Sequence, residues 1–212
     1  MISEDLGARI SFLVRLDDLK RVYRRTVLMG ETMHDPRHEN TAEHSWHLAM
    51  MALVLLPYAR EKVDPLTIVT MALIHDIPEI IAGDAYIYDE TAREAAVAKE
   101  QDAANVLFGM LPPDQAARLR ELWDDFTECR TPEARFVAAI DRLQPVLQNI
   151  HSKGIMWRWH GITAAQVIAK NQVMQRGAPE LWDYTVELIR RAVHDGVLPA
   201  GPVLPGEAAA RS

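Results

Sequence analysis

The sequence contains a single cysteine, Cys129, among its 212 residues. A disulfide within the chain needs two cysteines and a thiolate metal cluster needs several, so both are excluded. One cysteine is compatible with a reducing compartment, and we expect a cytoplasmic protein. The first residues, MISEDLGARI, also lack the basic and then apolar order of a secretory signal.

Long apolar runs and an excess of positive charge are absent as well. The longest apolar stretch, LAMMALVLLPYA at Leu48–Ala59, contains Pro57 and is shorter than the roughly 20 residues that span a bilayer, so we expect no membrane partner. The formal net charge is -7 at pH 7, whereas phosphate contacts to nucleic acid need clustered Lys and Arg. We therefore expect no nucleic-acid polymer as a partner, although a basic cluster, LKRVYRR, occupies Leu19–Arg25.

Apolar residues recur at helical spacing along most of the chain, and the sequence shows no sustained alternation of the strand type. Periodicity and capping signals predict helices over residues 10–28, 42–60, 65–83, 90–107, 114–126, 132–150, 164–175 and 179–195. Asn40 or Thr41 is placed to cap the second of these helices, and Asp64 before Pro65 marks the start of the third, which Pro78 is expected to kink just after Asp76. The helix over residues 132–150 has an apolar stripe of Phe136, Val137, Ile140, Leu143 and Leu147. The expected fold is all-α, a single-domain bundle of seven to eight helices over residues 1–195. Residues 196–212 are rich in Pro, Gly and Ala and are expected to form a loose surface tail.

Four polar residues stand out because each lies in a segment that otherwise faces the core: His44, His75, Asp76 and Asp141. Burying imidazoles and carboxylates is costly unless they pair with each other or with a cation. Two imidazoles with two carboxylates suit Mn²⁺, Co²⁺, Fe²⁺, Zn²⁺ or Ni²⁺. The alternative for His75 and Asp76 is a pair of core residues that satisfy one another.

The order of these residues resembles that of the HD-domain metal-dependent phosphohydrolase superfamily. The phrases LKRVYRRT, RHENTAEHSWHLAMMAL, HDIPEIIAGD and ARFVAAIDRLQPVLQN are similar to its 5'-deoxynucleotidase-like branch, and the likeness extends over residues 16–171. The resemblance implies that His44, His75, Asp76 and Asp141 hold one divalent cation, Mg²⁺ included, in a helical bundle that forms a homodimer. No histidine lies between Asp76 and Asp141, where two-metal members of the superfamily place additional ones, so we expect one metal.

Glu79 and Asp84 are the candidate catalytic residues. Glu79 lies four residues beyond His75 and three beyond Asp76, which places it on the same side of a helix. It is expected to act as a general base toward water or a general acid toward the leaving alkoxide. Asp84 is expected to orient Glu79 or the water, and the resemblance supports both positions. A surface carboxylate at Glu79 and a helix cap at Asp84 are the alternatives.

The substrate phosphate needs a cation, and Arg24 and Arg25 are the candidates, at the end of the first predicted helix. Their guanidinium forks suit phosphate, so we expect one or both to bind it; a solvated helix face is the alternative. Trp46 and His47 follow the first candidate ligand, and one of them is expected to stack on a base or cover the site. A core position is the alternative for Trp46, and a structural role beside the ligands is the alternative for His47. The aromatic stretch Trp157–Ile162 is expected to pack against a neighbouring subunit.

These features predict an enzyme that hydrolyses nucleoside 5'-monophosphates, deoxynucleotides above all, to a nucleoside and phosphate. Hydrolysis of a nucleoside triphosphate or an alarmone pyrophosphate linkage is the enzymatic alternative. The alarmone hydrolases resemble HDxxED, whereas Ile80 follows Glu79 here. A nucleotide-binding module without catalytic activity is the remaining alternative. The sequence leaves the base, the sugar and the metal undetermined.

Overall fold

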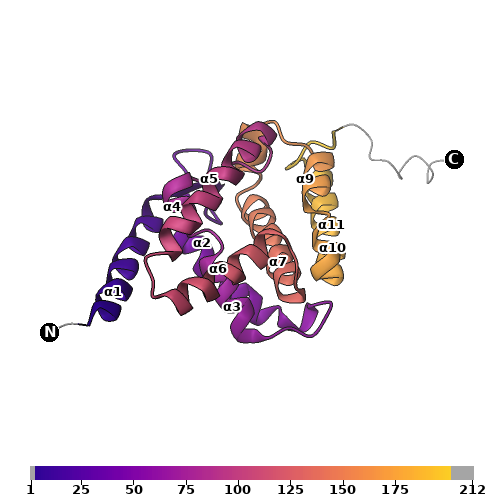
Figure 1. Cartoon of the computed structure of the whole chain (residues 1–212). Coiled ribbons are helices and arrows are strands. Elements are labelled where there is room, and N and C mark those ends of the chain that lie inside the picture. Colours follow the sequence, from indigo (N-terminus) through magenta and orange to yellow (C-terminus); the bar gives the residue numbers. More distant parts are fainter. Residues whose placement is uncertain (1–2, 202–212) are drawn as a thin grey trace.

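The computed structural model describes residues 3–201, and helices dominate them (Figure 1). The helices are α1 (Glu4–Leu16), α2 (Thr41–Val54), α3 (Pro65–Ile74), α4 (Glu79–Ala82), α5 (Glu90–Phe108), α6 (Pro113–Thr127), α7 (Pro132–His151), α8 (Ile155–Trp159), α9 (Ala164–Asn171), α10 (Met174–Gly177) and α11 (Pro179–His194). Two 3₁₀ turns, η1 (Asp17–Arg21) and η2 (Leu56–Tyr58), and a short antiparallel pair, β1 (Tyr23–Val27) with β2 (His38–Asn40), complete these residues. The all-α prediction is confirmed.

Helix α7 lies in the middle of the bundle (Figure 1). It contacts α2, α3 and α6 on one side and α9, α10 and α11 on another. A residue in the middle of α7 can therefore meet residues from the N-terminal half of the chain. The predicted bounds of α5, α6, α7 and α11 agree with the structure to within two residues at each end.

The prediction of a helix over residues 10–28 is wrong in its second half. Helix α1 ends at Leu16, the 3₁₀ turn follows, and the basic residues Arg24 and Arg25 lie in strand β1. Tyr23, Thr26 and Val27 favour an extended backbone, and the strand is fixed by its pairing with β2, whose last residue pairs with Tyr23. Because side chains alternate along a strand, Arg24 points inward while Arg25 is exposed.

The capping predictions for α2 and α3 are confirmed. The Asn40 side chain accepts from the backbone N–H of Glu43, and the Glu43 side chain reaches back to the Asn40 N–H, forming a capping box. Asp64 accepts from the backbone N–H of Thr67 and precedes Pro65 at the first position of α3. Helix α2 ends six residues before its predicted end, and the 3₁₀ turn containing Pro57 follows.

The third predicted helix is broken rather than kinked. Helix α3 ends at Ile74, residues 75–78 form a turn, and the one-turn helix α4 runs to Ala82 before Gly83, whose φ is +79°. Pro78 lacks an N–H, and its ring would clash with the carbonyl four residues earlier, at Ile74. The break leaves His75 and Asp76 at the end of a core helix.

The segment Pro65–Ala82 is apolar enough, by length and composition, to be a candidate membrane span. The break at residues 75–78 leaves α3 with 10 residues, about half of what a span requires. The structure buries 44% of the segment, and α3 packs on α2, α6 and α7. Core packing accounts for its apolar character.

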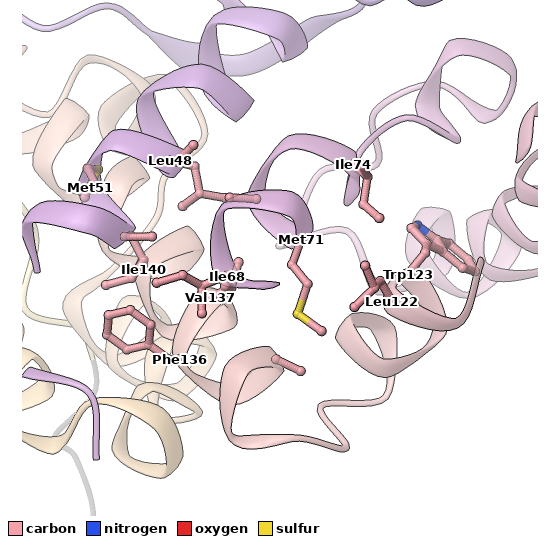
Figure 2. Packing of buried hydrophobic residues seen from close by; sticks show 14 of the residues in the cluster. Leu48, Met51, Ile68, Met71, Ile74, Leu122, Trp123, Phe136, Val137 and Ile140 are labelled. Atoms are coloured by element: carbon pink, nitrogen blue, oxygen red, sulfur yellow. The ribbon is translucent and has the colours of Figure 1, made fainter. Parts of the chain in front are cut away.

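The main core joins α2, α3, α6 and α7 (Figure 2). Its labelled side chains are Leu48, Met51, Ile68, Met71, Ile74, Leu122, Trp123, Phe136, Val137 and Ile140. The apolar stripe predicted for α7 faces this core: Phe136, Val137, Ile140 and Leu143 are buried, and Leu147 is partly buried. The core holds α2, α3 and α7 side by side, which fixes the ends from which the polar residues project.

A second cluster lies at the C-terminal side and includes Trp157, Ile162 and Leu198. Trp157 and Ile162 are buried within the chain itself, so the expectation that the whole stretch packs on another subunit is wrong for these two residues. The packing also extends past residue 195, because Leu198 is buried and the carbonyl of Pro199 accepts from the N–H of Ala164. The rest of the predicted tail, residues 202–212, lies outside the described residues.

Candidate metal centre and active site

Three separate elements bring His44, His75, Asp76 and Asp141 together. His44 lies in the first turn of α2, His75 and Asp76 follow α3, and Asp141 lies in the middle of α7. His44 Nε2 lies 3.0 Å from Asp141 Oδ1, and His75 Nε2 lies 3.1 Å from Asp76 Oδ2. Ligand atoms of His44, His75 and Asp141 all lie within 4.8 Å of one another. The four residues predicted as ligands therefore converge.

The environment of His75 shows that this cluster suits a cation. Its Nδ1 lies 2.9 Å from the carbonyl oxygen of Ala72, which can only accept, so Nδ1 carries the proton. In neutral His75, Nε2 then presents a lone pair, 3.1 Å from Asp76 Oδ2 and 3.8 Å from Asp141 Oδ1. This nitrogen is buried and has no hydrogen-bond partner among the described residues. Three acceptor atoms facing one point call for a positive charge between them.

His44 is fully buried and has a carboxylate on each side. Its Nε2 faces Asp141, and its Nδ1 lies 3.5 Å from Glu39 Oε2. Burial works against its charged form, but the hydrogen bond with Asp141 and the nearby Glu39 carboxylate outweigh it and raise the pKa of His44. Glu39 in turn accepts from Gln144 Nε2 at 2.9 Å. A carboxylate behind the outer nitrogen orients the ring of a metal-binding histidine, so Glu39 supports this role.

The inward-facing Arg24 reaches the same carboxylates. Its Nη1 donates to Asp76 Oδ2 at 2.6 Å, and its Nη2 lies 4.0 Å from Asp141 Oδ1. Burial opposes the ionised form of Asp76, but the neighbouring His75 and Arg24 prevail and lower its pKa to about 2. The pKa of Asp141 is lowered as well, because the hydrogen bond from His44 outweighs the effect of burial. Both carboxylates therefore keep their negative charge at neutral pH.

Glu79 begins helix α4 and shares a cavity wall with His75 and Asp76. Its Oε2 accepts from the hydroxyl of Thr41 at 3.0 Å. Burial, followed by the charge of Asp76, raises the pKa of Glu79 well above its ordinary value. Asp84 follows Gly83, and its pKa is raised mainly by burial. The charge of Asp84 also contributes to the raised pKa of Glu79, so the two carboxyls lie close enough to interact.

Two cavities meet at Asp141 and Arg142, and we name each by its walls. The charged cavity has a volume of about 190 Å³, and its polar walls include His75, Asp76, Glu79, Arg93 and Glu100. The aromatic cavity has a volume of about 90 Å³, and its walls include Arg24, Arg25, Asp84, Tyr86, Tyr88 and Trp157. Asp76, Glu79 and Glu100 thus face the first space, whereas the rings of Tyr86, Tyr88 and Trp157 face the second.

Two further residues singled out in the sequence do not cover the site. Trp46 points away from the core and is 64% exposed. His47 Nδ1 lies 3.3 Å from Gln144 Nε2, the amide that also donates to Glu39. His47 therefore contacts Gln144, which donates to Glu39 beside His44, and His47 is not among the converging ligands.

Residues 16–182 match the HD domain family, which is most of the chain. The protein belongs to the HD domain family. A solved structure of a predicted metal-dependent phosphohydrolase from Magnetospirillum magnetotacticum is 43% identical, covers 93% of this chain and 100% of its own, and has a TM-score of 0.84. The 5'-deoxynucleotidases HDDC2 of Bos taurus and Homo sapiens are 34% and 31% identical over 144 residues, which is 67% of this chain and 67% and 68% of theirs.

The predicted resemblance to HD-domain phosphohydrolases is therefore confirmed, and membership of this family implies a divalent metal. Sequence reasoning missed two residues of this HD domain, Glu39 and Thr41. Both lie next to Asn40, the N-cap of α2, and the capping signal there gave no reason to expect a further role in the site. Strand β2 turns Glu39 inward while His38 is less buried, and Thr41 is buried at the start of α2.

Proposed function

We propose that this HD domain hydrolyses nucleoside 5'-monophosphates, deoxynucleotides above all, to a nucleoside and phosphate. The observation that supports this function most directly is the convergence of His44, His75, Asp76 and Asp141 beside Glu79. Phosphate-ester hydrolysis needs a cation for the phosphoryl oxygens and a group that moves a proton, and this arrangement offers both. The names of the 5'-deoxynucleotidase relatives support the choice of substrate.

The proposed cation ligands are His44 and His75 through Nε2, with Asp76 and Asp141 through one carboxylate oxygen each. When bound, one divalent cation neutralises charge on the phosphoryl group and lowers the pKa of a water. The mixed nitrogen and oxygen donors accept Mn²⁺, Co²⁺, Fe²⁺, Zn²⁺ or Ni²⁺, and Mg²⁺ remains a candidate. Glu39 orients His44, and the Ala72 carbonyl orients His75.

Glu79 is the residue placed to move the proton. Its raised pKa, caused by burial and by the charge of Asp76, favours the protonated carboxyl more than in an ordinary glutamate. The hydroxyl of Thr41 fixes one carboxyl oxygen and leaves the other for the substrate. As water bonds to phosphorus and the bond to the 5' oxygen breaks, Glu79 gives its proton to that oxygen, and the proton that the water loses returns to Glu79. Asp84 supports this role, since its charge helps to keep the Glu79 proton in place.

The aromatic cavity is the proposed place for the nucleoside. Tyr86 and Tyr88 supply ring faces for a base, with ring centroids 5.3 Å apart, and Arg25 lies at the wall. Arg24 lies between this cavity and the candidate ligands, where it balances the charge of Asp76 and can reach a substrate oxygen. Of the two arginines, Arg24 is thus the one nearer the reacting group.

A phosphate-release assay tests this function. Purified protein supplied with Mn²⁺ or Co²⁺ is expected to release orthophosphate from deoxynucleoside monophosphates, and Glu79→Gln is expected to slow release about 10²- to 10⁴-fold while keeping the metal. The release of pyrophosphate or triphosphate instead would favour the larger-nucleotide alternative. Ligand binding in calorimetry without any product would favour the non-catalytic alternative. A panel of nucleotides without turnover, in protein whose metal content has been verified, would reject the proposal.

A cytoplasmic location and a homodimer stay predictions. The homodimer has one supporting feature, an apolar stripe on the outer face of α2 formed by Trp46, Met50 and Val54 at i, i+4 and i+8. Trp46 and Val54 are 64% and 69% exposed, which is unusual for large apolar side chains in one row. Light scattering of the wild type against a Trp46→Lys, Val54→Lys double variant tests it: a dimer that becomes monomeric is expected, and a monomeric wild type would refute it.

A further inference from the structure

The charged cavity is the space into which Glu79 and the candidate metal ligands open. Its walls include residues of the turn after α3 and of helices α4, α5, α6 and α7. A phosphoryl group that reacts at Glu79 must place its oxygens in or beside this space. The inference below rests on the proposed function and concerns the side chains that bind those oxygens.

The carboxyl groups of the charged cavity repel an anion unless cations also line the cavity. Three of its carboxyl groups, those of Asp76, Glu79 and Glu100, belong to separate elements. The pKa of Glu100 is raised, mainly by burial and then by the charge of Asp76, which lies on another element. A phosphate monoester carries close to two negative charges at neutral pH, so one metal ion facing several carboxylates leaves much of that charge unbalanced.

Arg24 is already engaged by carboxylates. Its Nη1 donates to Asp76 at 2.6 Å, its Nη2 lies 4.0 Å from Asp141, and its Nε lies 3.9 Å from Glu39. Its side chain is 14% exposed, and it lines the aromatic cavity rather than the charged one. Binding to Arg24 alone would leave the phosphoryl oxygens on the far side of the site without a donor.

Arg93 and Arg142 supply the missing cations. Arg93 lies in the first turns of α5 and is exposed, and Arg142 follows Asp141 on α7 and is half-buried. Among the described residues, neither has a carboxylate oxygen within 4.0 Å of its guanidinium nitrogens, and neither makes a side-chain hydrogen bond. Both line the charged cavity, and Arg142 lines the aromatic cavity as well. Two guanidinium groups that have no ion-pair or hydrogen-bond partner among the described residues therefore line the space in which the phosphoryl group must lie.

We propose that Arg93 and Arg142 bind the phosphoryl oxygens from α5 and α7, opposite Arg24. Arg142 lies where the two cavities meet, so it contacts the oxygens nearest the 5' carbon, while Arg93 contacts those farthest from it. Planar guanidinium groups suit this task because each can donate two parallel hydrogen bonds to a phosphate. The product, inorganic phosphate, is held by the same two residues until it leaves.

Binding of inorganic phosphate to the Mn²⁺-loaded full-length protein tests the proposal without turnover. Calorimetry is expected to show binding to the wild type and about 10- to 100-fold weaker binding to Arg142→Gln, as expected for the loss of a charged hydrogen bond. Arg93→Gln is expected to lose about 2- to 5-fold, because its side chain is exposed. Arg118→Gln is the matched control, since Arg118 is exposed on α6 and pairs with Glu121. Mn²⁺ binding is expected to be unchanged in all three variants.

Lysine variants keep the proposal testable if a glutamine variant does not fold. Arg142→Lys retains charge but lacks the fork, so intermediate phosphate binding is expected. Phosphate binding in both glutamine variants within twofold of Arg118→Gln would overturn the proposal, as would a Mn²⁺-loaded wild type that binds no phosphate. A wild type that binds phosphate through these residues but turns over no nucleotide would reject the proposed function and leave this inference standing.

Discussion

The charged and aromatic cavities share Asp141 and Arg142 but differ in almost everything else. The charged cavity gathers groups that exchange protons or bind cations, from elements that are fixed by the main core. The aromatic cavity is lined by the segment after Gly83 and by Trp157, which belongs to the second cluster. The two cavities are therefore built on two different packing units that meet along α7.

This difference separates chemistry from recognition. Residues of the charged cavity alter each other's pKa values, as Asp76 does for Glu79 and Glu100, so a change there affects reactivity. Tyr86 and Tyr88 have raised pKa values mainly because they are buried, so they stay neutral and contribute contact surface. A variant of Glu79 should therefore change kcat, and a variant of Tyr86 should change KM.

The largest effect is expected for Glu79→Gln in the charged cavity. General acid–base catalysis contributes about 10²- to 10⁴-fold, so kcat for a deoxynucleoside monophosphate should fall by that factor. KM and Mn²⁺ content should stay close to those of the wild type, because Glu79 is not one of the converging ligands. Steady-state kinetics with metal analysis checks this. Glu94→Gln, a change on the outer side of α5, serves as the control, and a fall of less than tenfold in Glu79→Gln would contradict the assignment.

The second largest effect is expected on metal-linked stability. A ligand at about 100 times its Kd stabilises the folded state by about 2.7 kcal/mol, and a domain of this size gains about 2–4 °C in Tm per kcal/mol. Mn²⁺ should therefore raise the Tm of the wild type by about 5–10 °C, and a chelator should reverse the rise. Asp141→Asn should show little response to either.

Scanning calorimetry with and without Mn²⁺ checks this linkage. Asp114→Asn, in the first turn of α6 and away from the converging residues, is the control that should respond as the wild type does. An Asp141→Asn protein that gains the full Tm rise would show that Asp141 does not hold the cation. Such a result would also weaken the contrast between the two cavities, because Asp141 lies in the walls of both.

The candidate ligands could be predicted because each was an exception to a simple pattern. His75 and Asp76 interrupt an apolar helix, and Asp141 interrupts the stripe of Phe136, Val137 and Ile140. Such exceptions stand out whatever the exact helix bounds are, since burial without a partner is costly. The motif order then resembled one family, and the match over residues 16–182 agrees with it.

The predictions that are wrong concern segments whose local structure depends on contacts with residues far away in the sequence. Residues 17–28 carry apolar residues at helical spacing, but pairing of β1 with β2, some 15 residues away, makes part of them a strand. Pro78 signalled a kink, whereas the helix ended at Ile74, which only the packed structure fixes. The supporting residues Glu39 and Thr41 were missed because their partners, His44 and Glu79, lie on other elements.

A smaller effect, on pH dependence, is expected for Thr41→Val. The hydrogen bond from Thr41 lowers the pKa of Glu79 against the larger effect of burial, so removing it should raise that pKa further. If Glu79 donates a proton, activity falls as pH rises through its pKa, and the falling limb should move to higher pH by about 0.5–1 unit. A pH profile of kcat checks this, with Thr67→Val as the control at a remote helix start. A shift to lower pH would contradict the role of Glu79 as acid.

The smallest effect is expected in the aromatic cavity and decides whether recognition is truly separate. Tyr86 packs against Tyr88 and His160, with ring centroids 5.3 and 4.8 Å away, and aromatic contacts are worth about 0.5–1.5 kcal/mol. Tyr86→Ala should therefore raise KM by about 2- to 12-fold with kcat nearly unchanged, whereas Tyr184→Ala, an exposed tyrosine on α11, should change neither. Inorganic phosphate should bind Tyr86→Ala as it binds the wild type, because the phosphoryl oxygens lie across Asp141 from this ring. A variant that instead lost kcat and kept KM would place Tyr86 with the reacting groups, and the two cavities would have to be treated as one.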